Sequence, residues 1–240
     1  MEDFFKKQIS ENYEQILDRV ASAALKSGRK PDQICVVVVT KAHSIETVKA
    51  VVDSGIENIG ENYVEEAILK MNSINVKNIK WHMIGHIQSR KARLVSQYFQ
   101  FVHSVDRIKV ARKLNQALET IQTKLPILLE CNVSGETTKH GFPAWDDGQW
   151  FGLEAEIEEI VELPNIRVQG LMTIPPWNPN PEESRTYFKR LVRLQNYLGR
   201  EFPHATWDDL SMGMSNDFEI AIQEGATYVR IGTAIVGPRD

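Results

Sequence analysis

The feature that most constrains the fold is an alternation of short apolar runs with helix-like segments through almost the whole chain. The first run, ICVVVVT at residues 34–40, carries no charge, so a strand there must be covered on both faces, as in a parallel sheet. Eight runs of this kind occur, at residues 34–40, 56–60, 79–84, 99–104, 125–132, 166–172, 206–211 and 227–231. The segments between them predict helices near 44–54, 63–74, 89–97, 107–123, 151–162, 182–201 and 217–223.

Eight strands, each followed by a helix or by the chain end, predict an α/β fold of the (β/α)8 TIM-barrel type. An open, doubly wound parallel sheet is the alternative. An extra helix is expected before the barrel, because apolar residues recur at three- and four-residue steps until Gly28 and Pro31. No segment has the composition of a linker, so residues 1–240 are expected to form one domain. Long loops are expected at 134–149 and in the Pro-rich stretch TIPPWNPNPEE.

Composition narrows the class of protein. The 240 residues carry a net charge of -4, and no region is basic enough to neutralise a run of phosphates, which argues against nucleic-acid binding. The start of the chain lacks the pattern of a secretory signal, and the longest aliphatic stretch is too short to cross a membrane. Cys35 and Cys131 show no metal or redox spacing and are expected to be buried thiols. We therefore expect a cytoplasmic enzyme or binding protein.

Lys41 is the most informative residue at a predicted strand end. It follows the aliphatic run directly, so its amine is expected at the rim of a low-dielectric core, where desolvation lowers a lysine pKa and favours imine formation. A solvated lysine at the end of a strand is the alternative. Arg230 lies inside the last apolar run and therefore needs a partner or a polar cavity. His82 and His86 are not assigned catalytic roles.

Two glycine-containing segments predict an anion site. SMGMSND follows the seventh predicted strand, and Ser215 is expected to cap a helix that begins near Asn216. VRIGTAIVG ends the eighth, where Gly232 and Thr233 are expected to open a short helical turn. Loops after the seventh and eighth strands commonly hold phosphate in barrels. Ordinary helix capping without a ligand is the alternative.

These segments together resemble the YggS/PROSC family, also called pyridoxal phosphate homeostasis proteins. The matching stretches are VVVVTKAHS, GIENIGENYVEEA, WHMIGHIQSRK, HSVDR, CNVSGETTKHGF, GLMTIPP, SMGMSNDFEIAI and VRIGTAIVG, and they occur in the family's order. The family is similar to the barrel domain of fold-type III enzymes such as alanine racemase.

The resemblance implies pyridoxal 5'-phosphate (PLP) as the cofactor, held as an imine on Lys41. It implies that Arg230 faces the pyridine nitrogen, that Asn62 lines the pocket, and that the phosphate is bound by Met214, Ser215, Gly232 and Thr233. It implies a protein that buffers or delivers PLP, with apo PLP-dependent enzymes as recipients and no catalytic residues. No metal-ligand cluster stands out in the sequence, so no metal is expected, and a monomer fits the absence of a swapped domain.

Efficient catalysis is not expected. An arginine beside the pyridine nitrogen disfavours protonation of the ring, which makes the ring a poorer electron sink. The chain also ends eight residues after Gly232, which leaves no length for the second domain of alanine racemase-type enzymes. Two alternatives remain: a PLP enzyme acting on amino acids, and an aldolase-type barrel that uses Lys41 directly on a phosphorylated sugar.

Overall fold

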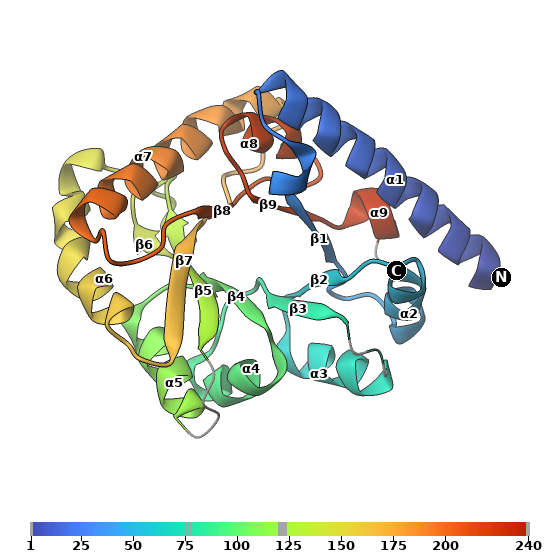
Figure 1. Ribbon diagram of the computed structural model, residues 1–240, viewed down its shortest axis with the longest axis horizontal. Coiled ribbons are helices and arrows are strands. Elements are labelled where there is room, and N and C mark those ends of the chain that lie inside the picture. The colour runs from blue at the N-terminus through green and yellow to red at the C-terminus, as the bar shows by residue number, and fades with distance from the viewer. Residues whose placement is uncertain (1, 75, 77, 120–123, 239–240) are drawn as a thin grey trace.

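The protein folds around a closed ring of parallel strands with helices outside it (Figure 1), in a computed structural model that describes residues 2–74, 76, 78–119 and 124–238. The ring strands are β1 (Cys35–Val39), β2 (Asn58–Glu61), β3 (Lys80–Met83), β4 (Phe101–Val105), β5 (Leu125–Asn132), β7 (Ile166–Met172), β8 (Asp209–Ser211) and β9 (Tyr228–Ile231). β1 pairs with β2 and with β9, and the pairing of β4 with β5 completes the circle. The predicted eight-stranded barrel is therefore confirmed, and the open sheet is wrong.

The helices cover the outer face of the ring. They are α1 (Glu2–Lys26), α2 (Ile45–Asp53), α3 (Val64–Ser73), α4 (Ala92–Tyr98), α5 (Ile108–Leu118), α6 (Glu154–Val161), α7 (Arg185–Glu201), α8 (Phe218–Gln223) and α9 (Thr233–Val236). Short 3₁₀ segments are η1 (Pro31–Gln33), η2 (Ser89–Lys91), η3 (Asp147–Leu153) and η4 (Pro181–Ser184). In the part of the chain that the structure describes, no helix is long and apolar enough to cross a membrane.

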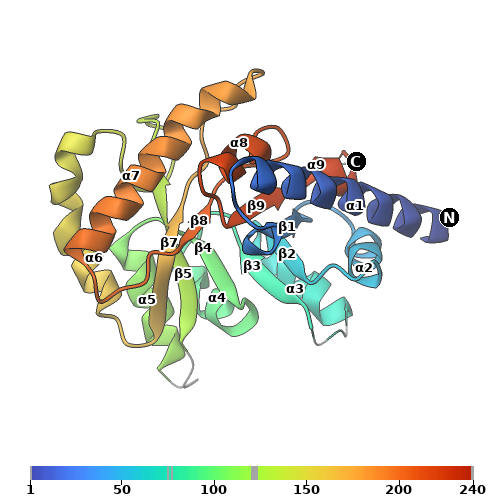
Figure 2. The ribbon, with the colours of Figure 1, turned by 45° about the horizontal axis from the view of Figure 1, so that its top comes forward.

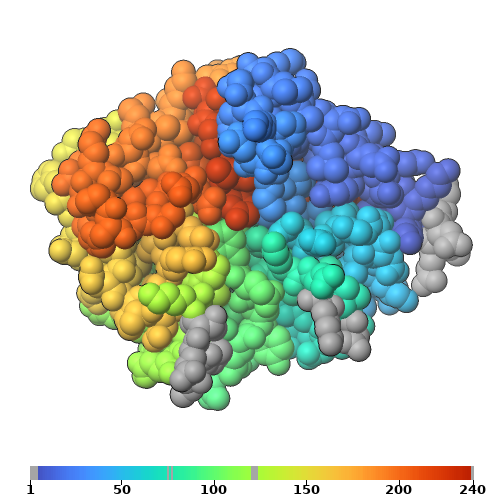
Figure 3. Space-filling model, viewed as in Figure 1, coloured from blue at the N-terminus to red at the C-terminus, as the bar shows by residue number. Residues whose placement is uncertain are grey.

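The first helix packs outside the ring and joins the N-terminal part of the chain to its C-terminal part. α1 packs against α2, α8 and α9, with its predicted apolar stripe buried, and it lies across α8 and α9 in Figure 2. The Asn12 side chain donates to the carbonyl of Ile235 at 3.0 Å, and Arg19 pairs with Glu219. Figure 3 shows the blue N-terminal surface directly beside the red C-terminal surface. The predicted extra helix is thus part of the packed structure.

The apolar core lies mainly between the strands and the helices. Inside the ring, Phe101, Leu128 and Met172 form a small separate apolar cluster, with Tyr228 packed against it. Barrel interiors are usually filled by branched aliphatic residues. The rest of this interior contains buried polar side chains, which are described below.

Several predicted boundaries differ from the structure. The seventh strand, expected at 206–211, begins only at Asp209, because the backbone carbonyl of Trp207 accepts a hydrogen bond from the Gln195 side chain and not from a neighbouring strand. An additional two-residue strand, β6 (Phe142–Pro143), pairs with β5 inside the predicted 134–149 loop. The helix expected at 107–123 is observed to Leu118, and residues 120–123 lie outside the described residues.

Candidate functional site

A cavity of about 290 Å³ opens at the carboxyl ends of the strands. All seven residues that the sequence predicts for the site line it: Lys41, Asn62, Met214, Ser215, Arg230, Gly232 and Thr233. The Pro-rich loop after β7 adds Ile174, Trp177 and Asn178 to the wall. These positions meet because the carboxyl ends of parallel barrel strands all open on the same side.

Lys41 lies in a tight turn that follows β1. Thr40, the residue before it, is fully buried and accepts a hydrogen bond from the His43 amide at 3.1 Å. Ala42, the residue after it, has a φ of 58° and is the only non-glycine residue among those described with positive φ. A left-handed conformation costs a residue with a side chain about 1–2 kcal/mol. The turn that presents Lys41 therefore needs contacts that hold it.

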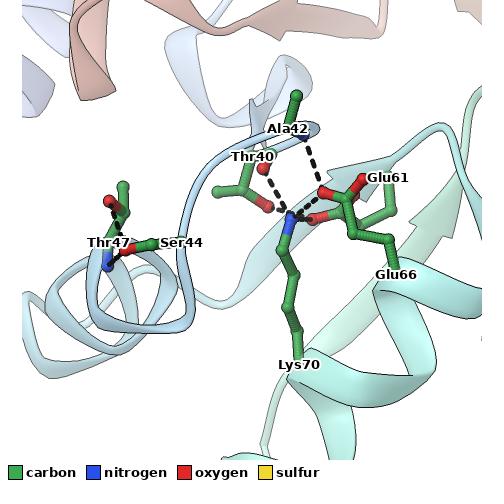
Figure 4. Close-up of polar contacts among 7 residues, drawn as sticks. All are labelled: Thr40, Ala42, Ser44, Thr47, Glu61, Glu66 and Lys70. Atoms are coloured by element: carbon green, nitrogen blue, oxygen red, sulfur yellow. Dashed lines mark hydrogen bonds and ion pairs between the residues drawn. The ribbon is translucent and has the colours of Figure 1, made fainter. Parts of the chain in front are cut away.

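A buried ion cluster supplies those contacts, and Figure 4 shows the Lys70 amine at its centre. Lys70 Nζ donates to the Thr40 carbonyl at 2.8 Å, to Glu61 Oε1 at 2.8 Å and to Glu66 Oε1 at 2.5 Å. Glu66 Oε1 also accepts the Ala42 amide at 2.7 Å, and Thr40 Oγ1 donates to Glu61 Oε1 at 2.6 Å. We call Thr40, Glu61, Glu66 and Lys70 the lysine clamp. It ties the ends of β1 and β2 and the start of α3 to the turn.

Burial of the central Lys70–Glu61 ion pair costs free energy, because both charges are removed from water. The side chains of Lys70 and Glu61 are 3% and 0% exposed. Burial raises the pKa of Glu61, and the hydrogen bonds from Lys70 and Thr40 oppose that rise. Removing one partner of such a pair leaves the other charge uncompensated.

Arg230 lines the same cavity from β9, the strand paired with β1, and is buried. Its Nη1 donates to Ser211 Oγ at 2.6 Å and its Nη2 donates to the Thr173 carbonyl at 2.8 Å. Burial lowers the pKa of Arg230 to about 10, against the opposing effect of the Glu130 and Asp217 carboxylates. Arg230 therefore remains a cation at neutral pH.

A line of neutral groups continues from Arg230 through the inside of the barrel. Ser211 Oγ lies 2.8 Å from His103 Nδ1, His103 Nε2 lies 3.0 Å from His82 Nδ1, and His82 Nε2 lies 3.1 Å from Asn58 Oδ1. Burial lowers the pKa of His82 to about 3 and that of His103 well below its usual value, so both rings are neutral. A neutral imidazole donates through one nitrogen and accepts through the other. Each group therefore donates to the next, from Arg230 to Asn58, and we call this line the histidine chain.

The loop after β8 corrects one sequence expectation. Helix α8 begins at Phe218 with Asp217 before it, so Ser215 is not the helix N-cap and that prediction is wrong. The Met214 carbonyl closes a turn by accepting the amide of Phe218, and the Met214 amide donates to Asp217 Oδ1 at 2.8 Å. Gly213 has a φ of 92°, and a side chain there would collide with α8. Ser215 therefore lies in the turn itself and lines the cavity.

The loops after β9 and β2 complete the site. Gly232 precedes α9 and Thr233 opens it, as predicted. Asn62 Oδ1 is buried and has no hydrogen-bond partner within the described residues. Asn216 Nδ2 donates to the Asn178 carbonyl at 2.9 Å, which joins the loop after β8 to the loop after β7.

Comparisons with known proteins agree with this architecture. The family model "Alanine racemase, N-terminal domain" matches residues 8–240. The pyridoxal phosphate homeostasis protein of Pseudomonas aeruginosa is 39% identical over 232 residues, which cover 97% of this chain and 96% of that protein. The chain belongs to the pyridoxal phosphate homeostasis protein family. The resemblance seen in the sequence motifs is confirmed.

Solved structures extend the likeness of this homeostasis family member to three dimensions. PipY of Synechococcus elongatus PCC7942, solved with PLP bound, is 30% identical with a TM-score of 0.79, over 92% of this chain and all of that chain. An alanine racemase of Clostridium difficile 630 has a TM-score of 0.68 at 15% identity, over 94% of this chain and 56% of that chain. The second likeness shows a shared barrel fold.

Sequence reasoning missed the lysine clamp of this family member. None of its four residues is among the predicted site residues, although Glu61 is fully buried. Two signals were present: Glu61 directly follows the predicted strand at 56–60, and Glu66 and Lys70 stand four residues apart on one helix. Such a spacing is usual on exposed helix faces, so by itself it does not indicate burial.

Proposed function

We propose that this chain binds PLP in the cavity at the carboxyl ends of the strands, holds it covalently on Lys41, and buffers or delivers it. The observation that carries the proposal is the meeting of Lys41 and Arg230 in one cavity with the loops after β8 and β9. The family membership and the PLP-bound structure of PipY support the same ligand.

The residues present fit this cofactor. A volume of about 290 Å³ is near the lower end of small-molecule pockets, which suits a compact ligand. Lys41 and Arg230 supply positive charge toward an anionic ligand. Asn62 Oδ1 is a buried acceptor for which the described residues offer no donor, and such an atom is expected where a ligand supplies the partner.

Phosphate binding is assigned to Met214, Ser215, Gly232 and Thr233. The hydroxyls of Ser215 and Thr233 and the backbone around Gly232 provide uncharged donors of the kind that hold phosphate in barrels. The Met214 amide already donates to Asp217, so its contribution requires that carboxylate to yield the bond. Ser215 and Thr233 therefore carry most of this assignment.

Arg230 supports a binding role over efficient catalysis. When bound, PLP supplies an aldehyde that a lysine amine can hold and a ring that can accept electrons. Arg230 is a fixed cation, because Ser211 and Thr173 hold its guanidinium. Facing the ring nitrogen, as in the family resemblance, it would disfavour a second positive charge there. The lysine clamp, for its part, holds the turn that presents the Lys41 amine.

The test of this function is borohydride reduction of the PLP-loaded protein, followed by peptide mass mapping. We expect the pyridoxyl mass on the peptide that contains Lys41 and its loss in Lys41→Ala. A pyridoxyl mass on another lysine of the wild-type protein would contradict the assignment.

A racemase-like activity on amino acids is the second candidate, favoured by the match to the alanine racemase domain. It is tested by incubating the PLP-loaded protein with L- or D-amino acids in deuterated water. We expect little exchange of the α-hydrogen. Exchange at about 1 per second or faster, which is an ordinary enzymatic rate, would favour the enzyme.

Delivery requires a recipient, and we propose apo forms of PLP-dependent enzymes, with this chain acting in the cytoplasm as a single-domain monomer. If transfer requires contact, the PLP-loaded protein will reactivate such an apo-enzyme when the two are mixed. It will not do so when a dialysis membrane that retains both proteins separates them. Sedimentation measures the mass of the donor in the same buffer.

A further inference from the structure

Three potential metal ligands meet at the open end of the barrel, outside the wall of the cofactor cavity. His86 follows β3, Asp106 follows β4, and His140 follows β5. His86 Nδ1 lies 3.0 Å from Asp106 Oδ2, His140 Nδ1 lies 3.9 Å from the same oxygen, and the three atoms lie within 4.8 Å of one another. Three separate loops thus direct their ligating atoms to one point.

The separation of His86 Nδ1 and Asp106 Oδ2, 3.0 Å, matches two ligands of one transition-metal ion, and His140 Nδ1 at 3.9 Å lies slightly beyond that range. Bonds of about 2.0–2.2 Å from a metal to nitrogen and oxygen place neighbouring ligand atoms roughly 3–3.5 Å apart. The two imidazole rings are stacked, with centroids 3.9 Å apart and an angle of 22° between their planes. His86 Nδ1 is close enough to Asp106 Oδ2 for a hydrogen bond, but His140 Nδ1, at 3.9 Å from the same oxygen, is not. The lone pairs of stacked rings lie in parallel planes, so one ion contacts both rings only after the exposed His140 side chain rotates toward Asp106.

Asp106 is held as a ligating carboxylate should be. Its side chain is 3% exposed, and its second oxygen accepts Arg107 Nη1 at 2.5 Å, while Arg107 Nη2 donates to the Ile87 carbonyl at 3.0 Å. A fixed partner on the outer oxygen orients a ligand toward its metal. Arg107 is a nearby positive charge, and its ion pair with the Asp106 carboxylate offsets it.

We propose that His86, Asp106 and His140 bind a divalent transition-metal ion, with zinc as the natural occupant and water in the remaining positions. Two imidazole nitrogens and one carboxylate oxygen suit zinc, cobalt and nickel, whereas calcium and magnesium prefer oxygen ligands throughout. The side chains of His86 and His140 are 35% and 57% exposed, so water reaches the open positions. The ion would join the loops after β3, β4 and β5 at the rim.

The test is titration of the full-length chain, purified without a histidine tag, with Co²⁺ and then Zn²⁺. Visible d–d absorption of Co²⁺ reports nitrogen and oxygen coordination. The variants are His86→Gln and His140→Gln, with folding checked by circular dichroism. The matched control is His204→Gln, because His204 pairs with a single carboxylate, Glu162, at 3.3 Å on the exposed surface.

We expect one Co²⁺ per chain, displaced by Zn²⁺, with affinity at least about tenfold weaker in both site variants, since even the partners that orient ligands contribute that much. His204→Gln is expected to bind as the wild-type protein does. Absence of binding to the wild-type chain, or equal binding in all four proteins, would overturn the proposal.

Discussion

The neighbouring strands β1 and β9 each bring a basic side chain to the cofactor cavity, and the two side chains are held in different ways. On the β1 side, the turn that presents Lys41 is fixed by charged groups, with Lys70 between Glu61 and Glu66. On the β9 side, Arg230 is fixed by neutral groups, a hydroxyl and a carbonyl, and the hydroxyl is backed by the histidine chain.

The difference between charged and neutral partners predicts how each group of residues responds to substitution and to pH. Paired charges in a buried site depend on each other, so losing one leaves a costly ion behind. Neutral groups that donate in one direction keep the site at a single positive charge, but they require both histidines to stay unprotonated. The lysine clamp is therefore expected to be sensitive to substitution, and the histidine chain to acid.

The largest expected effect is on the clamp. Lys70→Met should lower the free energy of unfolding by about 3–5 kcal/mol, because Glu61 would be left buried without its cation. Urea unfolding measures the change. Lys7→Met is the matched control, since Lys7 also pairs with a glutamate four residues away but on the exposed surface, where such a pair contributes about 0.5 kcal/mol or less. A loss below about 1 kcal/mol in Lys70→Met would mean that the clamp is not a buried ion pair in solution.

Next in size is an effect on ligand binding on the Arg230 side. Ser215→Ala and Thr233→Ala should each weaken PLP binding by about 1.5–3 kcal/mol, the value of a hydrogen bond to a charged group. Unphosphorylated pyridoxal should bind both variants as it binds the wild-type protein. Equilibrium dialysis with the two ligands makes the comparison. Equal losses for both ligands would locate the anion site elsewhere.

A smaller effect is expected from acid on the histidine chain. Unfolded His82 takes up a proton near pH 6.5, but in the folded protein its pKa is about 3. Between these values the unfolded state binds the extra proton, so stability falls as the pH falls, by about 2 kcal/mol at pH 5 from His82 alone. Unfolding at pH 7 and pH 5 should show a smaller loss in His82→Gln than in the wild-type protein. The same loss in both would indicate that His82 is accessible to protons when folded.

The smallest expected effect is on stability when the ligand-bearing side chain is removed. Lys41→Ala should change the free energy of unfolding by less than about 1 kcal/mol, because the clamp holds Thr40 and Ala42 by their backbones. The covalent adduct should be lost while some PLP still binds. Thermal unfolding and the absorption spectrum test both points. A variant that fails to fold would show that Lys41 itself supports the turn.

The sequence by itself determined the barrel and the gathering of the seven predicted site residues. Apolar runs that alternate with helical segments admit few folds, and residues placed just after successive parallel strands must emerge on one side. Position drew attention to Lys41, Arg230 and Thr233, the family resemblance assigned their roles, and the structure shows that all three line one cavity. The prediction that Ser215 caps a helix was wrong, because residues 214–217 form a turn and the helix begins only at Phe218.

Tertiary structure alone decided which polar residues are buried and with what. Glu66 and Lys70 have the spacing of an exposed helix pair, and only the packing of α3 against the ends of β1 and β2 removes Lys70 from water. One hydrogen bond of the histidine chain joins His103 to Ser211, which are 108 positions apart in the sequence. The cluster of His86, Asp106 and His140 brings together three loops. A local pattern reports which side chains share a face of one element. It does not report which other element covers that face, and the cover determines the pKa values, the pairing and the chemistry of these groups.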